Sequence, residues 1–270
     1  MDLTIQSDVE KLFKSEKIDC VFLVAGRVGG IQANMVFPAE FIYENISIQN
    51  NIIHYAYKYG VKKLIFVATS SIYPKDCGEM MTEDDILSGK LESTNEPYAV
   101  AKISGVKMCQ SYKKQYGFDA ISVIPCNMYG LNDKYIQENG HVIPTLLDRI
   151  HNAKINNDEY VEVWGTGKPR REFMFSEDCG DGLIFLAENY CSDEPINMGV
   201  GEDLKIASLV NVIVEVVGFK GKVKWDNTKP DGIKRKLLNS KKINQLGWHA
   251  KTDLKIGLEK MYSDFLNKKD

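Results

Sequence analysis

Short apolar runs and amphipathic stretches alternate along the first half of the chain. The runs at 20–25, 64–68 and 120–125 are almost entirely apolar, which is typical of strands buried in a parallel sheet. Between them, residues 38–59 and 97–116 repeat their apolar positions at helical spacing. The order strand, helix, strand, helix, strand predicts a parallel sheet covered by helices.

Helix-starting and helix-breaking residues indicate where some of these elements end. Pro38 begins the first long helix, which is expected to end before Gly60. A shorter helix is expected over 7–17, with Ser7 as its N-cap. Residues 27–36 show no helical or strand period and are expected to form a loop.

The pattern loosens after about residue 130. Short strands are expected at 161–164, 195–198 and 222–225, and helices near 142–152, 178–190, 206–217 and 253–267. No Pro-, Gly- or Ser-rich linker separates this half, so we expect a smaller lobe interleaved with the last sheet strands. A cleft between sheet and lobe follows, because ligands lie beyond the carboxyl ends of parallel strands.

Composition and charge narrow the class of protein. Hydrophobic residues make up 44% and charged residues 26% of the 270, so the chain can bury a core and is not disordered. The net charge of −3 disfavours a broad nucleic-acid surface. No apolar run approaches the roughly 18 residues that span a bilayer, and the polar N-terminus does not resemble a signal peptide.

The six cysteines are scattered along the chain and form no CxxC pair. We interpret them as reduced thiols of a cytoplasmic protein, and expect neither a disulfide framework nor a metal site.

The strongest chemical pattern is Tyr98-Ala-Val-Ala-Lys102, because residues four apart share one face of a helix. A phenol has a pKa of about 10, and a nearby ammonium is expected to lower it by favouring the phenolate. Thr69-Ser70-Ser71 follows the preceding strand, where a hydroxyl can contact the same substrate oxygen. Together these groups would polarise a carbonyl while a hydride arrives. The alternative is a surface tyrosine and lysine without a role.

Further segments make the pattern specific. They read VGGIQAN at 28–34, PAEFIYENISIQNNII at 38–53, SSIYPK at 70–75, TNEPYAVAK at 94–102, NMYG at 127–130, HVIPTLL at 141–147, WGTGKPRREF at 164–173, INMGVGED at 196–203, KPDG at 229–232 and RKLL at 235–238. Over essentially its whole length the chain resembles the extended short-chain dehydrogenase/reductases, and within them the GDP-L-fucose synthase family.

The resemblance implies an α/β fold of the Rossmann type, a doubly wound parallel sheet with a smaller C-terminal α+β lobe. It implies an N-terminally incomplete dinucleotide-binding domain over 1–130. Residues 131–270 would form mainly a substrate-binding lobe, interleaved with the last sheet strands. It also implies a homodimer packed through the helices at 38–59 and 97–116.

The family uses NADPH to reduce the C4 ketone of a GDP-4-keto-6-deoxy sugar after inverting C3 and C5. By resemblance, Tyr98 is the proton donor to O4, and Lys102 lowers its pKa and holds the nicotinamide ribose. Thr69 matches the hydroxyl position. His141 matches the acid for epimerisation, although a histidine at a helix start is otherwise more often a cap.

Ser71 departs from the family, which typically has cysteine at this position. A thiol with a pKa of about 8.5 supplies some thiolate at neutral pH, whereas a serine hydroxyl needs a base of its own. Our hypothesis is that epimerisation is weakened and reduction is retained. The alternative is that Ser71 merely packs, and that a water or Cys126 takes its place.

The resemblance also implies two binding sets. The cofactor set is Asp2, Leu3, Val67, Ala68, Thr69, Ser70, Tyr98, Lys102, Pro125, Cys126, Asn127, Met128 and His141, and the cofactor is NADP(H). The substrate set is Arg149, Trp164, Arg171, Asp231 and Lys236. Arginine suits bidentate contact with a diphosphate, although the charge runs KPRRE and KRK read equally well as solvated surface.

The glycine-rich phosphate loop expected of a dinucleotide site is missing from its usual place after a first strand. Gly26, Gly29 and Gly30 follow the strand at 20–25, but the next position in the spacing is Gln32, and no helix is expected between that strand and residue 38. The resemblance places the loop upstream of residue 1, within roughly 55–60 further residues. Without them, the strand at 20–25 is expected to form an exposed apolar edge that favours association.

Other functions stay open. A nucleotide-sugar dehydratase is disfavoured, because those enzymes follow the threonine with an Asp-Glu pair and here Thr69 is followed by two serines. Other possibilities are a different nucleotide-sugar 4-ketoreductase or 4-epimerase, a cofactor-less GDP-sugar-binding or regulatory subunit, and a fragment of a longer enzyme.

Overall fold

The computed structural model describes residues 1–78, 80–135, 140–229 and 231–268. Its helices are α1 (Gln6–Ser15), α2 (Ile31–Val36), α3 (Pro38–Lys58), α4 (Glu96–Tyr116), α5 (Val142–Ile155), α6 (Ser176–Asn189), α7 (Ile206–Val217), α8 (Lys241–Gln245) and α9 (Leu254–Asn267), with short 3-10 turns η1 (Ser70–Ile72) and η2 (Glu83–Asp85). Its strands are β1 (Cys20–Leu23), β2 (Lys63–Val67), β3 (Ala120–Pro125), β4 (Asn127–Tyr129), β5 (Tyr160–Trp164), β6 (Arg170–Arg171), β7 (Phe173–Phe175), β8 (Ile196–Met198), β9 (Leu204–Lys205), β10 (Lys222–Asp226) and β11 (Arg235–Lys236).

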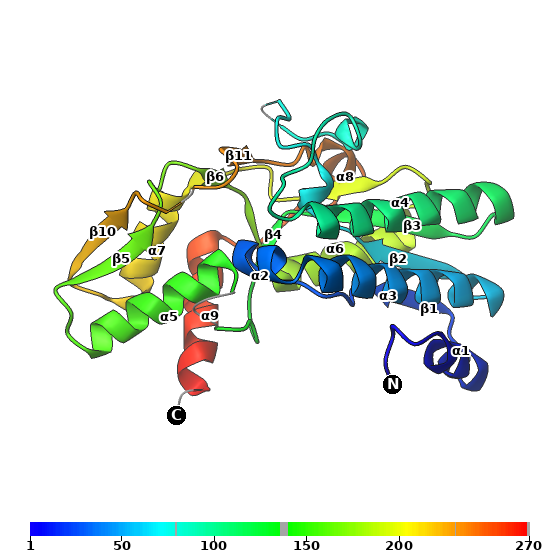
Figure 1. The fold of residues 1–270 in the computed structure, drawn as a ribbon, viewed down its shortest axis with the longest axis horizontal. Helices are drawn as coiled ribbons and strands as arrows, with labels where there is room; N and C mark the ends of the chain where they lie inside the picture. The colour runs from blue at the N-terminus through cyan, green and yellow to red at the C-terminus, as the bar shows by residue number, and fades with distance from the viewer. Residues whose placement is uncertain (79, 136–139, 230, 269–270) are drawn as a thin grey trace.

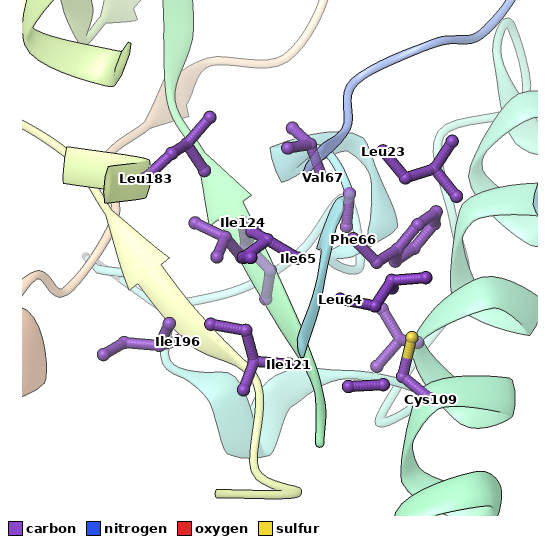
Figure 2. Close-up of a cluster of buried hydrophobic side chains, with 14 of the residues drawn as sticks. Leu23, Leu64, Ile65, Phe66, Val67, Cys109, Ile121, Ile124, Leu183 and Ile196 are labelled. Carbon is purple, nitrogen blue, oxygen red and sulfur yellow. The ribbon is translucent and has the colours of Figure 1, made fainter. Parts of the chain in front are cut away.

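Four strands form the main sheet in the order β1-β2-β3-β8, and all three pairings are parallel. The predicted parallel sheet is therefore confirmed. Helices α3 and α4 lie side by side next to the sheet (Figure 1). Figure 2 shows side chains of β2, β3 and β8 between Leu183 of α6 and Cys109 of α4. The sheet is thus covered on both faces, which explains why its central strands are apolar throughout.

A second buried cluster lies outside the main sheet. It joins α5, α7 and α9 to β5 and β7, with Leu147, Val163, Leu209 and Met261 all nearly inaccessible to solvent. Strands β5 and β10 pair in parallel at this end of the molecule (Figure 1). The later elements α6 and β8 return to the main sheet, so its core contains segments far apart in the sequence.

Two local expectations are wrong. Ser7 does not cap α1: Ile5 is the N-cap residue, and Ser7 lies inside the helix. Residues 27–36 are not all loop, because α2 occupies 31–36 and a helix therefore begins before residue 38. The amide of Asn34 donates to the carbonyl oxygens of Gly29 and Gly30, which stabilises this short turn of helix. The apolar run at 20–25 forms a strand only as far as Leu23.

Strand β1 lies at one edge of the main sheet. Phe22 and Val24 are 41% and 64% exposed there, as expected for an apolar edge. All six cysteines are free thiols. In the part of the chain that the structure describes, no helix is long and apolar enough to cross a membrane.

Candidate active site

The first turns of α4 bring Tyr98 and Lys102 to the carboxyl end of β2. The Nζ atom of Lys102 donates to the backbone oxygen of Val67 at 3.0 Å, and lies 5.0 Å from the ring centre of Phe66. Gly105 allows this close packing, because a Cβ atom at that position would lie 2.3 Å from the Phe66 ring. The lysine is 4% exposed, so it is buried between α4 and the sheet and is not a surface residue.

Burial sets the protonation of this pair. It raises the pKa of Tyr98 to about 12, and a hydrogen bond with Thr69 offsets only part of the rise. It lowers the pKa of Lys102 to about 8. The expectation that Lys102 lowers the pKa of Tyr98 is therefore wrong for this structure, because loss of solvation disfavours the charged form of each group. At neutral pH Tyr98 is a phenol and can donate a proton.

Ser71 lies between the start of α4 and β11. The backbone N–H of Ser71 donates to Oγ1 of Thr69 at 3.3 Å. Its own Oγ atom accepts hydrogen bonds from Nδ2 of Asn95 and from Nζ of Lys236, both at 3.3 Å. The structure therefore brings three predicted residues together. Asn95 was not predicted, although it lies in the matched segment TNEPYAVAK and is the N-cap residue of α4.

Backbone pairing holds the residues that follow β11 against Met81, just before η2. The amide of Met81 donates to the backbone oxygen of Leu237 at 2.8 Å, and the amide of Asn239 donates to that of Met81 at 2.9 Å. Leu237 and Leu238 are both buried. This short parallel contact fixes Lys236 next to Ser71, although 165 residues separate them in the sequence.

Strands β6 and β11 present two different pairs of cations. Arg170 and Arg235 stand opposite each other in the parallel pairing of β6 with β11. Both bind the carboxylate of Asp203, whose side chain is 2% exposed. Arg171 pairs with Lys236, and successive side chains of a strand point to opposite faces. Among the ion pairs of the described residues, none involves Arg171 or Lys236. Burial lowers the pKa of both groups because it removes water from their charged forms, and an anion placed between them would restore that lost stabilisation.

Arg149 and Trp164 meet at the far end of the predicted substrate set. The Arg149 guanidinium lies 5.4 Å from the Trp164 ring centre, and the Lys229 ammonium lies 5.2 Å from it. Trp164 is 49% exposed. Nearby, Asp231 accepts from the backbone N–H and the hydroxyl of Thr166 at 2.7 and 2.6 Å. An exposed aromatic face with cations beside it suits a flat base attached to phosphates.

Two candidates do not join this network. His141 is the exposed N-cap residue of α5, and no hydrogen bond among the described residues connects it to Tyr98 or Ser71. Cys126 is buried, and burial raises its pKa well above the usual range. A thiol that stays protonated is a poor base, so Cys126 is poorly suited to replace the family cysteine.

The other residues of the predicted cofactor set lie at the ends of elements. Val67, Ala68 and Ser70 are at the carboxyl end of β2, Pro125, Cys126, Asn127 and Met128 run from the end of β3 into β4, and Asp2 and Leu3 precede α1. Parallel pairing of β2 with β3 places the first two groups at the same edge of the sheet. The side chain of Asn51 donates to the backbone oxygen of Leu3, which holds the N-terminal segment against α3.

The residues around Lys102 fit the ribose of a nicotinamide cofactor. A Cβ atom at Gly26 would lie 2.7 Å from Oδ1 of Asn45 and 3.5 Å from Nζ of Lys102. Oδ1 of Asn45 is buried and has no hydrogen-bond partner among the described residues. The Asn45 oxygen can accept a hydrogen bond from a ribose hydroxyl and the Lys102 ammonium can donate one. Gly26, which has no side chain, leaves room for the ribose beside them. Asn45 was not predicted as functional, although a polar residue at a core-facing helical position is a signal.

Comparison with known proteins identifies the family. A family model described as the NAD dependent epimerase/dehydratase family matches residues 1–201. The chain belongs to this family. It is 50% identical over 266 residues to GDP-L-fucose synthase 1 of Arabidopsis thaliana, covering 98% of this chain and 82% of that protein. The resemblance found in the sequence is therefore confirmed, and the chain is an enzyme of a nicotinamide-dependent family.

Solved structures of this family confirm the fold class. A GDP-6-OMe-4-keto-L-xylo-heptose reductase from Campylobacter jejuni superposes with a TM-score of 0.94 at 33% identity, covering 99% of this chain and 88% of that one. A GDP-L-fucose synthetase from Naegleria fowleri bound to NADP superposes with a TM-score of 0.91 at 27% identity, covering 99% and 83%. Family members of this kind are NADP-dependent oxidoreductases acting on nucleotide sugars.

Proposed function

We propose that this chain converts GDP-4-keto-6-deoxy-D-mannose to GDP-L-fucose with NADPH, and that Ser71 weakens the epimerisation steps. The observation that carries the proposal is the placement of Tyr98, Thr69 and Lys102 together at the carboxyl end of β2. Similarity to GDP-L-fucose synthases over 98% of the chain supports the choice of substrate.

A bound NADPH would supply the hydride that the ketone carbon receives. Tyr98 is protonated at neutral pH and donates its proton to O4 as the carbonyl becomes an alcohol. Thr69 orients the phenol by hydrogen bonding and offers a second polar contact to O4. Lys102 and Asn45 hold the ribose of the cofactor.

The second lobe binds the GDP part of the substrate. Arg171 binds the diphosphate, and Lys236 extends the positive charge from there toward Ser71. Trp164 and Arg149 hold the guanine by stacking and hydrogen bonding. Asp231 fixes the Gly165–Thr166 turn that follows Trp164 through its two bonds to Thr166.

Steady-state assays and titrations test the proposal together. The full chain is mixed with NADPH and GDP-4-keto-6-deoxymannose, and the loss of NADPH absorbance is followed. We expect NADPH consumption that depends on the GDP-sugar, and separate calorimetric titrations should detect both ligands. GDP binding without NADPH binding or consumption would instead support a regulatory GDP-sugar binder.

A second candidate is a GDP-sugar 4-ketoreductase without epimerase activity. It is favoured by the serine at position 71 and by the similarity to a GDP-4-keto-heptose reductase. The product distinguishes the two: inverted C3 and C5 would indicate GDP-L-fucose, whereas unchanged configuration would indicate a plain reductase.

Three further parts of the proposal concern the whole protein. We propose a homodimer formed through α3 and α4, where Tyr43 is 67% exposed and Val100 is 41% exposed. We propose that residues 1–130 mainly bind the cofactor and 131–270 mainly the substrate. The free thiols agree with a cytoplasmic location.

A further inference from the structure

A serine and a lysine from opposite ends of the chain meet beside the proposed reaction centre. Nζ of Lys236 lies 3.3 Å from Oγ of Ser71, and the backbone N–H of Ser71 contacts the hydroxyl of Thr69. Thr69 in turn bonds Tyr98. Ser71 and Thr69 therefore connect the lysine to the group proposed to protonate O4, and the lysine is not only among the diphosphate ligands.

The surroundings of Lys236 make its neutral amine form more accessible than that of an exposed lysine. Burial and the nearby Arg171 of β6 lower the pKa of Lys236 to about 8, and Glu92, in the segment before α4, opposes them only in part. Asp231 acts on Arg171 and not on Lys236. With a pKa of about 8, roughly one lysine in ten is neutral at pH 7, and a neutral amine accepts protons.

The side chains around Ser71 would stabilise it while it exchanges a proton. Nδ2 of Asn95 donates to Ser71 Oγ at 3.3 Å. The serine oxygen is the acceptor in this bond, so the serine hydroxyl proton stays available for another acceptor. Oδ1 of Asn95 is buried and has no hydrogen-bond partner among the described residues. Serine needs an adjacent base to act on a proton at neutral pH, and the neutral form of Lys236 is such a base.

We propose that Ser71 and Lys236 form the base that removes the proton from the carbon next to the C4 ketone, in place of the family cysteine. This inference rests on the proposed GDP-4-keto-sugar substrate. Ser71 Oγ takes the carbon-bound proton while its own hydroxyl proton passes to the neutral amine of Lys236. The C–H electron pair moves onto O4 as an enolate, which Tyr98 and Thr69 stabilise by hydrogen bonding. Return of the proton regenerates the ketone and the neutral amine.

The reaction is expected to be slow at neutral pH and faster in mild base. Its rate follows the neutral fraction of Lys236, so it should rise with pH up to the pKa that Lys236 has beside the bound diphosphate, and then level off. This agrees with a weakened epimerisation, because the family thiol needs no second base.

Deuterium exchange separates this role from simple diphosphate binding. GDP-4-keto-6-deoxymannose is incubated in D₂O with the full chain and NADP⁺, which cannot reduce the ketone, and mass spectrometry follows the gain of deuterium. Variants are Lys236→Arg, Lys236→Met and Ser71→Ala. Lys242→Arg, at an exposed ion pair with Glu194, serves as the matched control.

We expect Ser71→Ala and both Lys236 variants to lose at least tenfold in exchange rate. Arginine keeps the positive charge but does not deprotonate, so Lys236→Arg should bind the GDP-sugar more tightly than Lys236→Met while exchanging equally poorly. Lys242→Arg should exchange at the parent rate, and thermal melting of each variant confirms that it is folded.

Parent-like exchange in folded Lys236→Arg would overturn the inference, and so would a parent chain that reduces the ketone but never exchanges. Exchange without any reduction in the NADPH assay would leave this inference standing and contradict the proposed function. The two failures are therefore distinguishable.

Discussion

At the residue scale, burial decides the chemistry of Tyr98 and Lys102 more than their mutual distance does. The pKa of the phenol rises and that of the ammonium falls, so both groups tend toward their neutral forms. The phenol is then ready to donate a proton at neutral pH, which is the state that ketone reduction requires.

Removing the Tyr98 hydroxyl should abolish reduction without removing the substrate site. We expect Tyr98→Phe to lower kcat by about 100-fold or more, because a positioned proton donor contributes roughly that much. The Kd for GDP-sugar, measured by calorimetry, should change by less than about threefold. Turnover retained within tenfold of the parent would mean that another group protonates O4.

We expect the burial of Lys102 to lower the free energy of unfolding. Its pKa falls from 10.5 in the unfolded chain to about 8 in the folded one. The unfolded chain therefore holds the proton more tightly, and the free energy of unfolding should rise with pH between about 8 and 10.5. At pH 7, Lys102→Met should raise the free energy of unfolding by about 2 kcal/mol, after allowing for the lost bond to Val67, and should abolish activity. Urea unfolding of the parent and of Lys102→Met at pH 7 and pH 10 measures the pH dependence and the gain in stability. A variant less stable than the parent at pH 7 would contradict the expected cost of burying Lys102.

The spacing of Tyr98 and Lys102 and the hydroxyl of Thr69 could be predicted from the sequence, because one helix turn and one strand end determine their positions. The pKa directions could not be predicted, because they depend on burial by other segments. Asn45 and Asn95 were missed for a related reason: helical periodicity records where a side chain points but not which polar atom remains without a partner.

At the element scale, Asp203 is the residue that holds the short strands β6 and β11 in place. Burial pushes its pKa upward, but hydrogen bonds from Arg170 and Arg235 outweigh this and hold the pKa below its usual range. The two arginines come from different strands, and the carboxylate joins them from one face. Arg171 and Lys236 are thereby fixed on the other face.

Loss of this carboxylate should destabilise the protein and weaken substrate binding. We expect Asp203→Asn to lower the free energy of unfolding by about 3 kcal/mol at pH 7, because two guanidinium groups lose their partner. Asp181→Asn, which removes an exposed carboxylate next to Lys251, should cost less than about 1 kcal/mol.

The pH dependence of the difference between parent and Asp203→Asn is a further check. Because the folded-state pKa is depressed, the contribution of Asp203 is fully present above about pH 4 and is lost as the pH falls through the folded pKa. Urea unfolding between pH 3 and pH 7 measures it. A difference that stays constant down to pH 3 would show that charge is not what holds β6 and β11.

The long helices and the buried strands could be predicted because each carries its own pattern over many residues. The two-residue strands β6, β9 and β11 could not, since a pair of residues has no period. They exist because of distant partners such as Asp203. The helix α2 was missed because its stabilising contacts come from the Asn34 side chain and not from an apolar face.

At the scale of the whole molecule, the chain contributes to two buried clusters in alternation. The early strands, α6 and β8 belong to the main-sheet cluster, and α5, β5, α7 and α9 belong to the second cluster. The fold class could be predicted from the alternating order of strands and helices and from a resemblance spread over the whole chain. The return of α6 and β8 to the main sheet was foreseen only as interleaving, because nothing local in these segments specifies which cluster they join.

The proposed dimer can be tested with charges placed on exposed apolar side chains. Val100→Asp on α4 should convert the protein to a monomer in sedimentation velocity, because an interface cannot bury an unpaired carboxylate at low cost. Ile184→Asp on α6, where the side chain is 57% exposed, is the matched control and should leave the dimer intact. Monomerisation by the control alone would place the interface on another face.

The most direct test of ketone reduction follows the hydride itself. The full chain is incubated with GDP-4-keto-6-deoxymannose and NADPH deuterated at its hydride position, and the sugar product is examined by NMR. We expect deuterium at C4 of the GDP-sugar with the parent chain and none with Tyr98→Phe. An unchanged ketone after incubation with the folded parent chain would contradict the assignment of this site as a reductase.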